Sequence, residues 1–199
     1  NQNVYVYKDK LYDKLFTRTL GWNGGDGVKT TILPGGHLFW SFNDSFYGRV
    51  TSSNRSRGSC NFPRNSIMVQ RADANERPSD ESKDQVWLAD WVSRNSSSNK
   101  YYHARTHIRH PKGEKTDAEI KNGDIDQTYL YWAGDATVVD GKMQMLWSGV
   151  FNGTENLMQS DNRALAIYSL EGQPGDDTYL KLESVDHDFF TYDPFGYGD

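Results

Sequence analysis

Short apolar runs alternate with polar residues along the whole chain. The runs are made of Val, Ile, Tyr, Phe and Trp and are cut by Gly, Asn, Asp and Pro, while helical periodicity is scarce. This pattern is typical of an all-β protein built from antiparallel strands. The expected strands cover 4–7, 27–33, 37–43, 66–71, 101–108, 129–132, 136–139, 142–148, 164–170 and 179–183.

Two polar stretches separate these strands. Residues 49–61 are dense in Ser, Arg and Asn and predict a loop. Residues 72–100 form a polar insertion between two hairpin units near 25–71 and 129–183, within one domain of residues 1–199. Inside the insertion, Trp87 and Trp91 are four residues apart, a spacing that fits a short amphipathic helix.

The two hairpin units resemble each other. Gly25 and Asp26 open a strand that turns at Pro-Gly-Gly and returns, and Gly134 and Asp135 open a second strand that turns at Asp-Gly. The last four residues, GYGD at 196–199, match the opening of a third unit. Recurring units of this kind predict a β-propeller, of which this chain covers about two blades and the start of a third.

Composition narrows the function classes. The 199 residues carry a net charge of −5, which argues against nucleic acid as a partner because nucleic-acid binders usually present a basic face. No apolar run approaches the roughly 20 residues of a membrane span. Cys60 is the one cysteine, so an intrachain disulfide and a cysteine-based zinc site are both excluded.

Two carboxylates of the first hairpin are expected to face each other. If the residues flanking the Pro-Gly-Gly turn pair, the antiparallel register brings Asp26 opposite Asp44. Opposed residues lie about 5 Å apart at Cα and project to the same side, and like charges that close cannot both ionise at their usual pKa. The alternative is that each Asp only caps a turn through nearby backbone N–H groups.

Histidines and acidic loops are the candidate metal ligands. On an extended strand His103 and His107 would share a face but lie about 13 Å apart, too far to bind one zinc ion. Arg105, His107 and Arg109 would alternate onto one face, which either reaches an anionic sugar group or is simply solvated. The segment NGDID at 122–126 resembles a calcium loop in composition but lacks the EF-hand Gly and Glu, which leaves a structural calcium site of another kind open. We expect no other metal and no cofactor.

A family resemblance rests on four segments of the sequence. They are WNGGDG at 22–27, LFWSFNDSF at 38–46, RNS at 64–66 and YWAGD at 131–135. These segments resemble the signatures of secreted bacterial five-bladed β-propeller domains of unknown function, which are related to endo-D-arabinanases and other propeller glycoside hydrolases. The resemblance implies an extracytoplasmic protein with a central funnel where sugars bind.

The resemblance also implies roles for individual residues. Asp26 would be the general base, Asp135 would tune the pKa of the acid, and Asp199 would be the acid, with Asp44 in support. We expect a wide, water-mediated arrangement of these carboxylates across blades, because carboxyl groups about 6.5 to 9.5 Å apart leave room for water. The expected substrate-binding residues are Trp22, Asn23, Arg64, Asn65, Trp132 and His107.

The sequence therefore predicts a glycoside hydrolase that acts on extracellular polysaccharide. Its expected partners are an oligo- or polysaccharide and the remainder of the propeller chain. One alternative is a non-catalytic carbohydrate-binding or adhesive propeller, and another is a structural β domain of a larger protein. Enzyme and binding module share aromatic funnels, so only a pair of carboxylates at a chemically usable separation distinguishes them.

Overall fold

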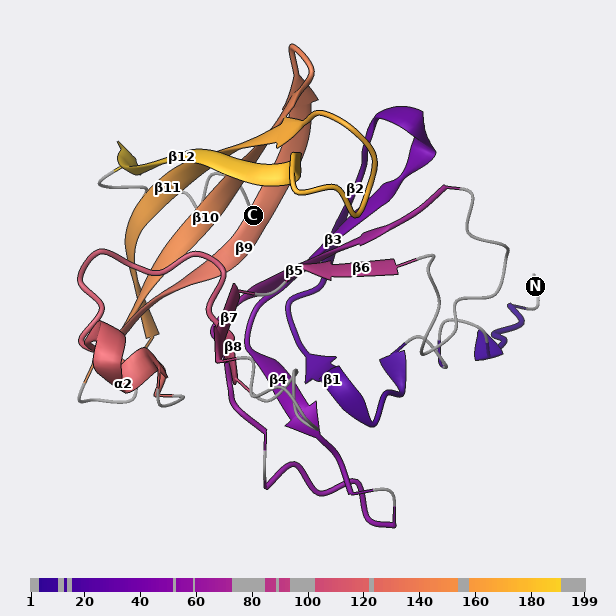
Figure 1. Ribbon diagram of the computed structural model, residues 1–199, viewed down its shortest axis with the longest axis horizontal. Coiled ribbons are helices and arrows are strands. Elements are labelled where there is room, and N and C mark those ends of the chain that lie inside the picture. The colour runs from indigo at the N-terminus through magenta and orange to yellow at the C-terminus, as the bar shows by residue number, and fades with distance from the viewer. Residues whose placement is uncertain are drawn as a thin grey trace.

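The computed structural model describes residues 4–10, 13, 16–51, 53–58, 60–72, 85–88, 90–93, 103–121, 124–153 and 158–190. The fold is all-β, as the sequence predicts, with antiparallel sheets that are all open (Figure 1). One four-stranded sheet has the order β2-β3-β5-β6 and the other has the order β12-β11-β10-β9, and two-stranded sheets pair β1 with β4 and β7 with β8. The strands are β1 (Leu20–Gly25), β2 (Lys29–Ile32), β3 (Leu38–Phe42), β4 (Ser45–Arg49), β5 (Ser66–Gln70), β6 (Gln85–Leu88), β7 (Asp90–Ser93), β8 (His103–Arg105), β9 (Tyr129–Val139), β10 (Lys142–Asn152), β11 (Met158–Leu170) and β12 (Tyr179–Phe190). The helical elements are η1 (Pro34–Gly36) and α2 (Asp117–Lys121).

The first hairpin continues from the β2–β3 pair into the β1–β4 pair, and its register is kept as far as Gly24, where β1 has a register shift. Ile32 pairs with Leu38 next to the η1 turn, where Gly35 and Gly36 have φ of 81° and 80°, a conformation that favours glycine. The same register holds beyond β2 and β3, where Gly25 pairs with Ser45 in β1 and β4. One long two-stranded ribbon therefore runs from the η1 turn through β2 and β3 into β1 and β4.

The second hairpin is formed by β9 and β10. Its turn residues Asp140 and Gly141 both have positive φ, 49° and 75°, which matches the right-handed twist of the flanking strands. Lys142 pairs with Val139, and a register shift follows between Met145 and Trp147. This register shift, a β-bulge, lies opposite Gly134 and Asp135. The strand pairing at the Gly-Asp segment therefore differs between the two hairpins, although their sequences are alike there.

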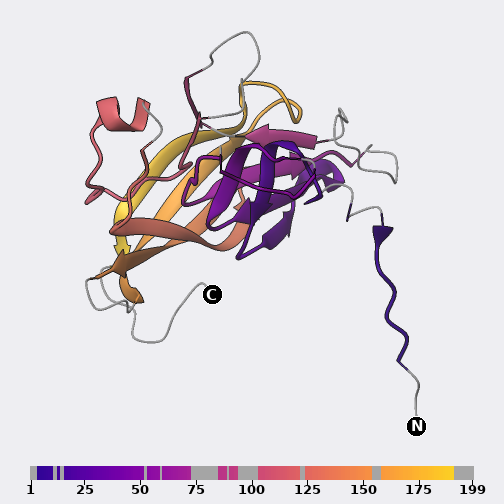
Figure 2. The same ribbon diagram turned by 90° about the horizontal axis from the view of Figure 1, so that it is seen from below.

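The main hydrophobic core lies between the two four-stranded sheets. Phe39, Ile67 and Val69 come from one sheet, and Met143 and Trp147 come from the other, all nearly inaccessible to solvent. The two sheets lie next to each other (Figure 2) and share this core, as expected for stacked units that each bury one sheet face on the next. The arrangement of these sheets as blades around a propeller axis stays a prediction.

Two expected elements differ in the structure. Residues 4–7 form no strand, and the side chains of Val4 and Val6 are 86% and 90% exposed. Their composition favours an extended backbone, but a strand also needs a partner that supplies hydrogen bonds. The helix expected around Trp87 and Trp91 is wrong: these residues lie in β6 and β7, because sheet pairing overrides a four-residue spacing.

Candidate active site

Asp26 and Asp44 lie opposite each other where the ribbon passes from β2–β3 into β1–β4. The Asp26 N–H donates to the Asp44 carbonyl at 3.2 Å, and the Asn43 N–H donates to the Asp26 carbonyl at 2.9 Å. Glycine is required next to this pair, because Gly27 has φ of 55° and a Cβ there would come within 1.9 Å of the Asn43 amide nitrogen. The two carboxylates therefore leave the same mouth of one hairpin.

Both carboxylates line a pocket of about 330 Å³. Its other walls are the glycines of β1 and three side chains from β4 and the loop that follows it, and the full lining is Gly24, Gly25, Asp26, Asp44, Phe46, Arg57 and Phe62. Asp26 is exposed and Asp44 is half-buried. We call this cavity the carboxylate pocket.

Asp44 sits in a mixed electrostatic environment. Burial raises the pKa of Asp44 above its ordinary value, the charge of Arg64 and a hydrogen bond from Trp132 lower it, and the charge of Asp26 raises it again, with a net increase. Arg64 Nη1 lies 3.2 Å from one carboxylate oxygen, and Trp132 Nε1 lies 3.5 Å from the other. The pair thus combines the exposed carboxylate of Asp26 with the carboxyl of Asp44, which keeps its proton to a higher pH than an ordinary aspartate does.

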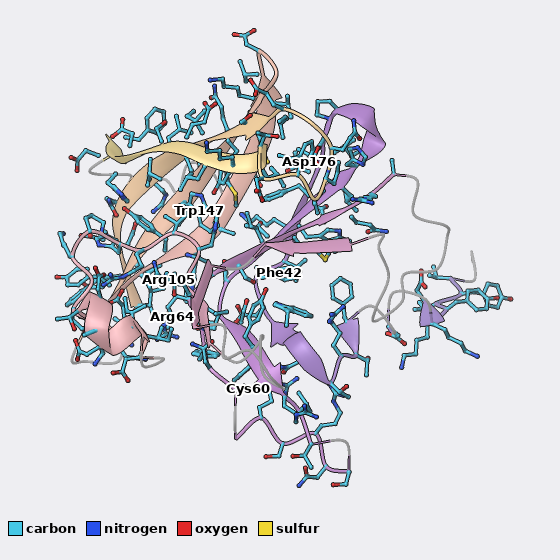
Figure 3. The ribbon with its side chains drawn as sticks, viewed as in Figure 1. Phe42, Cys60, Arg64, Arg105, Trp147 and Asp176 are labelled. Atoms are coloured by element: carbon cyan, nitrogen blue, oxygen red, sulfur yellow. The ribbon has the colours of Figure 1, made fainter. Side chains whose placement is uncertain are left out.

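Arg64 is buried and tied to three parts of the chain (Figure 3). Its backbone N–H donates to the Thr106 hydroxyl, and its guanidinium donates to the Asp126 carbonyl at 3.0 Å and to the Gln127 amide oxygen at 2.9 Å. These bonds fix the guanidinium in one orientation. Arg64 therefore positions Asp44 at the wall of the pocket.

Two arginines sandwich a pair of phenylalanine rings beside the carboxylates. Phe46 and Phe62 have ring centroids 4.7 Å apart, with Arg57 over Phe46 at 5.0 Å and Arg64 over Phe62 at 5.1 Å. Arg57 donates hydrogen bonds to the side-chain and backbone oxygens of Asn23, at 2.8 and 3.0 Å. Asn23 lies at a register shift of β1, and such a bulge re-aims a side chain.

Two residues of β9 in the second unit reach this site. The Ala133 N–H of β9 donates to the Asn43 side chain at 2.8 Å, and Trp132 reaches Asp44 as described above. Asp135 is not among the residues that line the carboxylate pocket; its side chain is 70% exposed and lies 3.8 Å from Lys29 Nζ. The wide arrangement of carboxylates across units stays a prediction, and Asp199 lies outside the described residues.

Two of the other expected sugar contacts, Trp22 and His107, pack against aromatic side chains of the protein. Trp22 packs on Phe42 with ring centroids 4.7 Å apart and is almost fully buried. His107 stacks on Tyr168 and hydrogen-bonds its hydroxyl at 3.0 Å, and burial lowers the pKa of His107 to about 4. Neither residue lines the carboxylate pocket.

Asn65 is a cross-link between the two units. Its amide donates to the carbonyls of Ile108 and Tyr131 and accepts from the Ile108 N–H, each at 2.9 Å. All of these groups are remote from solvent, and Asn65 itself has 0% exposure. The residue holds the segment after β8 against β9.

Replacing Asn65 by Ala is expected to lower the free energy of unfolding of the protein by about 3 kcal/mol. The change would strand two buried carbonyls and one buried N–H, and each unsatisfied group costs about 1–3 kcal/mol, offset in part by relaxation. Urea unfolding of the Asn65→Ala protein measures the loss. Asn54→Ala, in an exposed turn, is the control with a change below about 0.5 kcal/mol. A loss below 1 kcal/mol for Asn65→Ala would contradict the cross-link.

Metal ligands do not gather in the described part of the chain. No group of three or more His, Cys, Asp and Glu side chains there could hold an ion. Of the acidic loop at 122–126, Asp126 accepts hydrogen bonds from Arg109 at 2.6 and 3.1 Å and from the Lys115 N–H at 2.8 Å. The Asp126 carboxylate therefore links Arg109 to the backbone of Lys115 through hydrogen bonds. Among the same residues, no helix is long and apolar enough to cross a membrane.

The sequence and the fold both have known relatives. Residues 9–199 match a domain of unknown function, DUF5005. The chain belongs to the DUF5005 family. The DUF5005 chain is also similar to a crystal structure from Bacteroides ovatus described as that of a candidate hydrolase, at 56% sequence identity and a TM-score of 0.83. The match covers 94% of this chain and 45% of that one, and no curated protein matches.

Proposed function

We propose that this DUF5005 chain supplies the catalytic carboxylates of a glycoside hydrolase. The observation that carries the proposal is the opposition of Asp26 and Asp44 at one hairpin mouth, where both line a pocket of about 330 Å³. Glycosidases typically use a pair of carboxyl groups on either side of the scissile bond. The similar Bacteroides ovatus protein, described as a candidate hydrolase, supports a hydrolytic reaction.

The two carboxylates suit different roles. Asp44, whose pKa is raised, would serve as the acid, and the exposed Asp26 would serve as the nucleophile. A carboxylate oxygen of Asp26 bonds to the anomeric carbon while the bond from that carbon to the glycosidic oxygen breaks and the Asp44 proton moves to the leaving oxygen. Water then gives a proton to Asp44 and displaces Asp26 from the anomeric carbon, which restores both groups.

This assignment favours retention of the anomeric configuration. Retaining enzymes hold their two carboxyl groups about 5 Å apart, and two carboxylates that leave one hairpin mouth and line the same pocket suit such a close pair. An inverting enzyme would need a wider gap with room for water. Asp135 would then remain outside the reaction as a residue that positions the substrate or the neighbouring unit.

Phe46, Phe62 and Arg57 would form the sugar-binding wall. Aromatic faces stack on sugar rings, and a guanidinium over a ring can donate hydrogen bonds to sugar hydroxyls. Gly24 keeps this wall open, because a Cβ there would meet the Arg57 guanidinium at 2.9 Å. These three residues are not among the sugar-binding residues expected from the sequence, which include Trp22 and Trp132.

A non-catalytic glycan-binding module is the second candidate. The observation that favours it is the Arg64–Asp44 ion pair, because a guanidinium 3.2 Å from the carboxylate stabilises its charged form and opposes the role of proton donor. In that case the Phe46–Phe62 wall and Arg57 would bind sugar and nothing would be cleaved.

Release of reducing sugar from a panel of polysaccharides by the intact protein tests the proposal. NMR of the first product then gives its anomeric configuration, which we expect to match that of the substrate. Binding without cleavage would support the non-catalytic glycan-binding module. A product with inverted anomeric configuration would support the wide arrangement of carboxylates across units.

We further propose that the two face-packed sheets are blades of a five-bladed propeller whose remainder lies elsewhere in the protein. The activity would be extracytoplasmic and independent of a cofactor, with oligo- or polysaccharide as substrate. The support is the family resemblance of the four sequence segments and the packing of one sheet face on the next.

A further inference from the structure

A second and larger pocket lies at the other end of the β2–β3 hairpin. It has a volume of about 590 Å³ and is enclosed by the η1 turn, the end of β5 and the loop between β11 and β12. We call it the distal pocket. The residues that decide its chemistry are Gly35, His37, Arg71, Gln173, Pro174 and Tyr179.

The distal pocket is separate from the carboxylate pocket. Asp26 precedes β2 and Gly35 follows it, and an extended chain of this length spans roughly 25–30 Å. In Figure 3, Asp176 in the β11–β12 loop and Arg64 beside Asp44 lie well apart. The two cavities share no lining residue.

Arg71 brings a positive charge to this pocket. Among the described residues, no carboxylate forms an ion pair with its guanidinium. Its Nε donates to the Pro174 carbonyl at 3.1 Å, and its Nη2 donates to the same oxygen. These bonds hold the half-buried guanidinium by one edge, so that its remaining N–H groups are available. The fixed orientation lowers the entropy cost of binding an anion.

His37 adds a second donor. Its Nδ1 accepts a hydrogen bond from the Ala72 N–H at 3.0 Å, so the neutral ring carries its proton on Nε2. That nitrogen lies 3.2 Å from the position that a Cβ on Gly35 would occupy, and the absence of a side chain at Gly35 leaves space beside it. Tyr179 holds the imidazole edge-on, with ring centroids 6.0 Å apart.

The pocket walls include no Asp or Glu among the residues that the structure describes. Asp176 lies close by, but its carboxylate accepts from the Gln173 N–H at 2.8 Å and is not part of the lining. Leu170, Pro174 and the rings of His37 and Tyr179 give apolar and aromatic surface, and Gln173 offers an amide at the rim. The pocket thus combines a fixed cation, a neutral donor and ring-sized apolar faces.

We propose that the distal pocket binds the carboxylate of an acidic sugar, of the hexuronic acid type, one or two rings in length. The carboxylate would accept from Arg71 and His37, while the sugar ring lies against Tyr179 and Pro174 with hydroxyls in reach of Gln173. A volume of about 590 Å³ lies within the usual range for small-molecule sites. On the proposed hydrolase function, on which this role rests, the site would hold a charged glycan on the protein at a distance from Asp26 and Asp44.

Calorimetric titration of the intact protein with digalacturonate, beside its uncharged methyl ester, tests this inference. We expect digalacturonate to bind at least tenfold more tightly than the ester, because a hydrogen bond to a charged group contributes about 1.5–3 kcal/mol. Arg71→Met keeps the apolar stem and should weaken digalacturonate binding tenfold or more. Arg49→Met, on the exposed rim of β4, is the matched control and should leave it unchanged.

Further variants keep the test decisive. His37→Phe retains the ring and should weaken binding by a smaller factor, whereas Asp26→Asn should leave it unchanged because the two pockets are separate. Equal binding of acid and ester, or full affinity in both Arg71→Met and His37→Phe, would overturn the proposal. Competition by inorganic phosphate as effective as by digalacturonate would also overturn it, since the site would then select charge alone.

Discussion

Replacing Asp26 by Asn is expected to reduce kcat on a cleavable glycan by about 10³-fold or more, with little change in glycan affinity. The change keeps the shape of the side chain and removes the charge that would attack the anomeric carbon. Initial rates with the intact variant measure the loss, and glycan binding measured separately shows that the pocket survives. Asp177→Asn, at an exposed position in the β11–β12 loop, is the matched control with full activity. Full activity in Asp26→Asn would end the catalytic assignment.

Asp44→Asn should lower kcat by about 10²–10⁴-fold, the usual contribution of a general acid. The pH profile gives the readout that a structural role would not give. If Asp44 is the acid, activity of the unmodified protein is lost as pH rises through the raised pKa of Asp44, because the proton is then gone before the leaving oxygen needs it. The residual activity of Asp44→Asn should lack this loss at high pH. A profile identical in both proteins would remove Asp44 from the acid role.

Asp135→Asn separates the two carboxylate arrangements. If Asp26 and Asp44 act as the pair, this variant should keep at least half of the activity, because Asp135 is exposed and contacts only Lys29 among the described residues. A loss as large as that of Asp26→Asn would favour the wide arrangement across units that the family resemblance implies.

The register of the first hairpin could be predicted because local chemistry sets it. Pro34 starts the turn, Gly35 and Gly36 supply the positive φ values, and the same register is found in β2–β3 and again at Gly25 and Ser45, next to Asp26 and Asp44. The Asp-Gly turn of the second hairpin works in the same way. Such features are encoded in a few neighbouring residues, which a single sequence displays directly.

The wall of the carboxylate pocket could not be predicted because its contacts join residues that are distant in the sequence. Arg57 is held by Asn23, and it comes from a loop whose Ser-Arg-Asn composition carries no periodic signal. Phe62 meets Phe46 only after that loop has folded back. The bulge at Asn23 has no sequence signal other than the neighbouring glycines. The inward direction of the Asn23 side chain is therefore evident only from the structure.

Two of the residues expected to bind sugar also have structural roles. Trp22 and His107 were expected near sugar because aromatic and imidazole side chains suit that role, yet the same groups also fill cores. Trp22 is almost fully buried against Phe42, and His107 is half-buried and stacks on Tyr168. Residue type alone does not distinguish the two uses, whereas burial does.

Stability is expected to fall in mild acid because of His107. Its pKa is about 4 in the folded protein, as burial beside Trp147 and Tyr168 disfavours the imidazolium, and about 6.5 when unfolded. The unfolded chain therefore binds a proton that the folded chain excludes, so stability decreases as pH falls from about 6.5 to about 4 and is unaffected by this group outside that window. The lost free energy would be about 2–3 kcal/mol from His107 alone.

The contribution of His107 can be isolated by comparison with a variant. His110, whose pKa is also lowered chiefly by burial, acts in the same direction, so the acid sensitivity of the unmodified protein exceeds that of one histidine. His107→Gln keeps a group that can hydrogen-bond the Tyr168 hydroxyl and removes the titration. Urea unfolding at pH 7.5 and pH 4.5 should show a smaller drop for His107→Gln by about 2 kcal/mol, even where the variant is less stable at both pH values. Equal drops would mean that His107 titrates alike in the folded and unfolded chains, and that the packing against Trp147 and Tyr168 tolerates its charge.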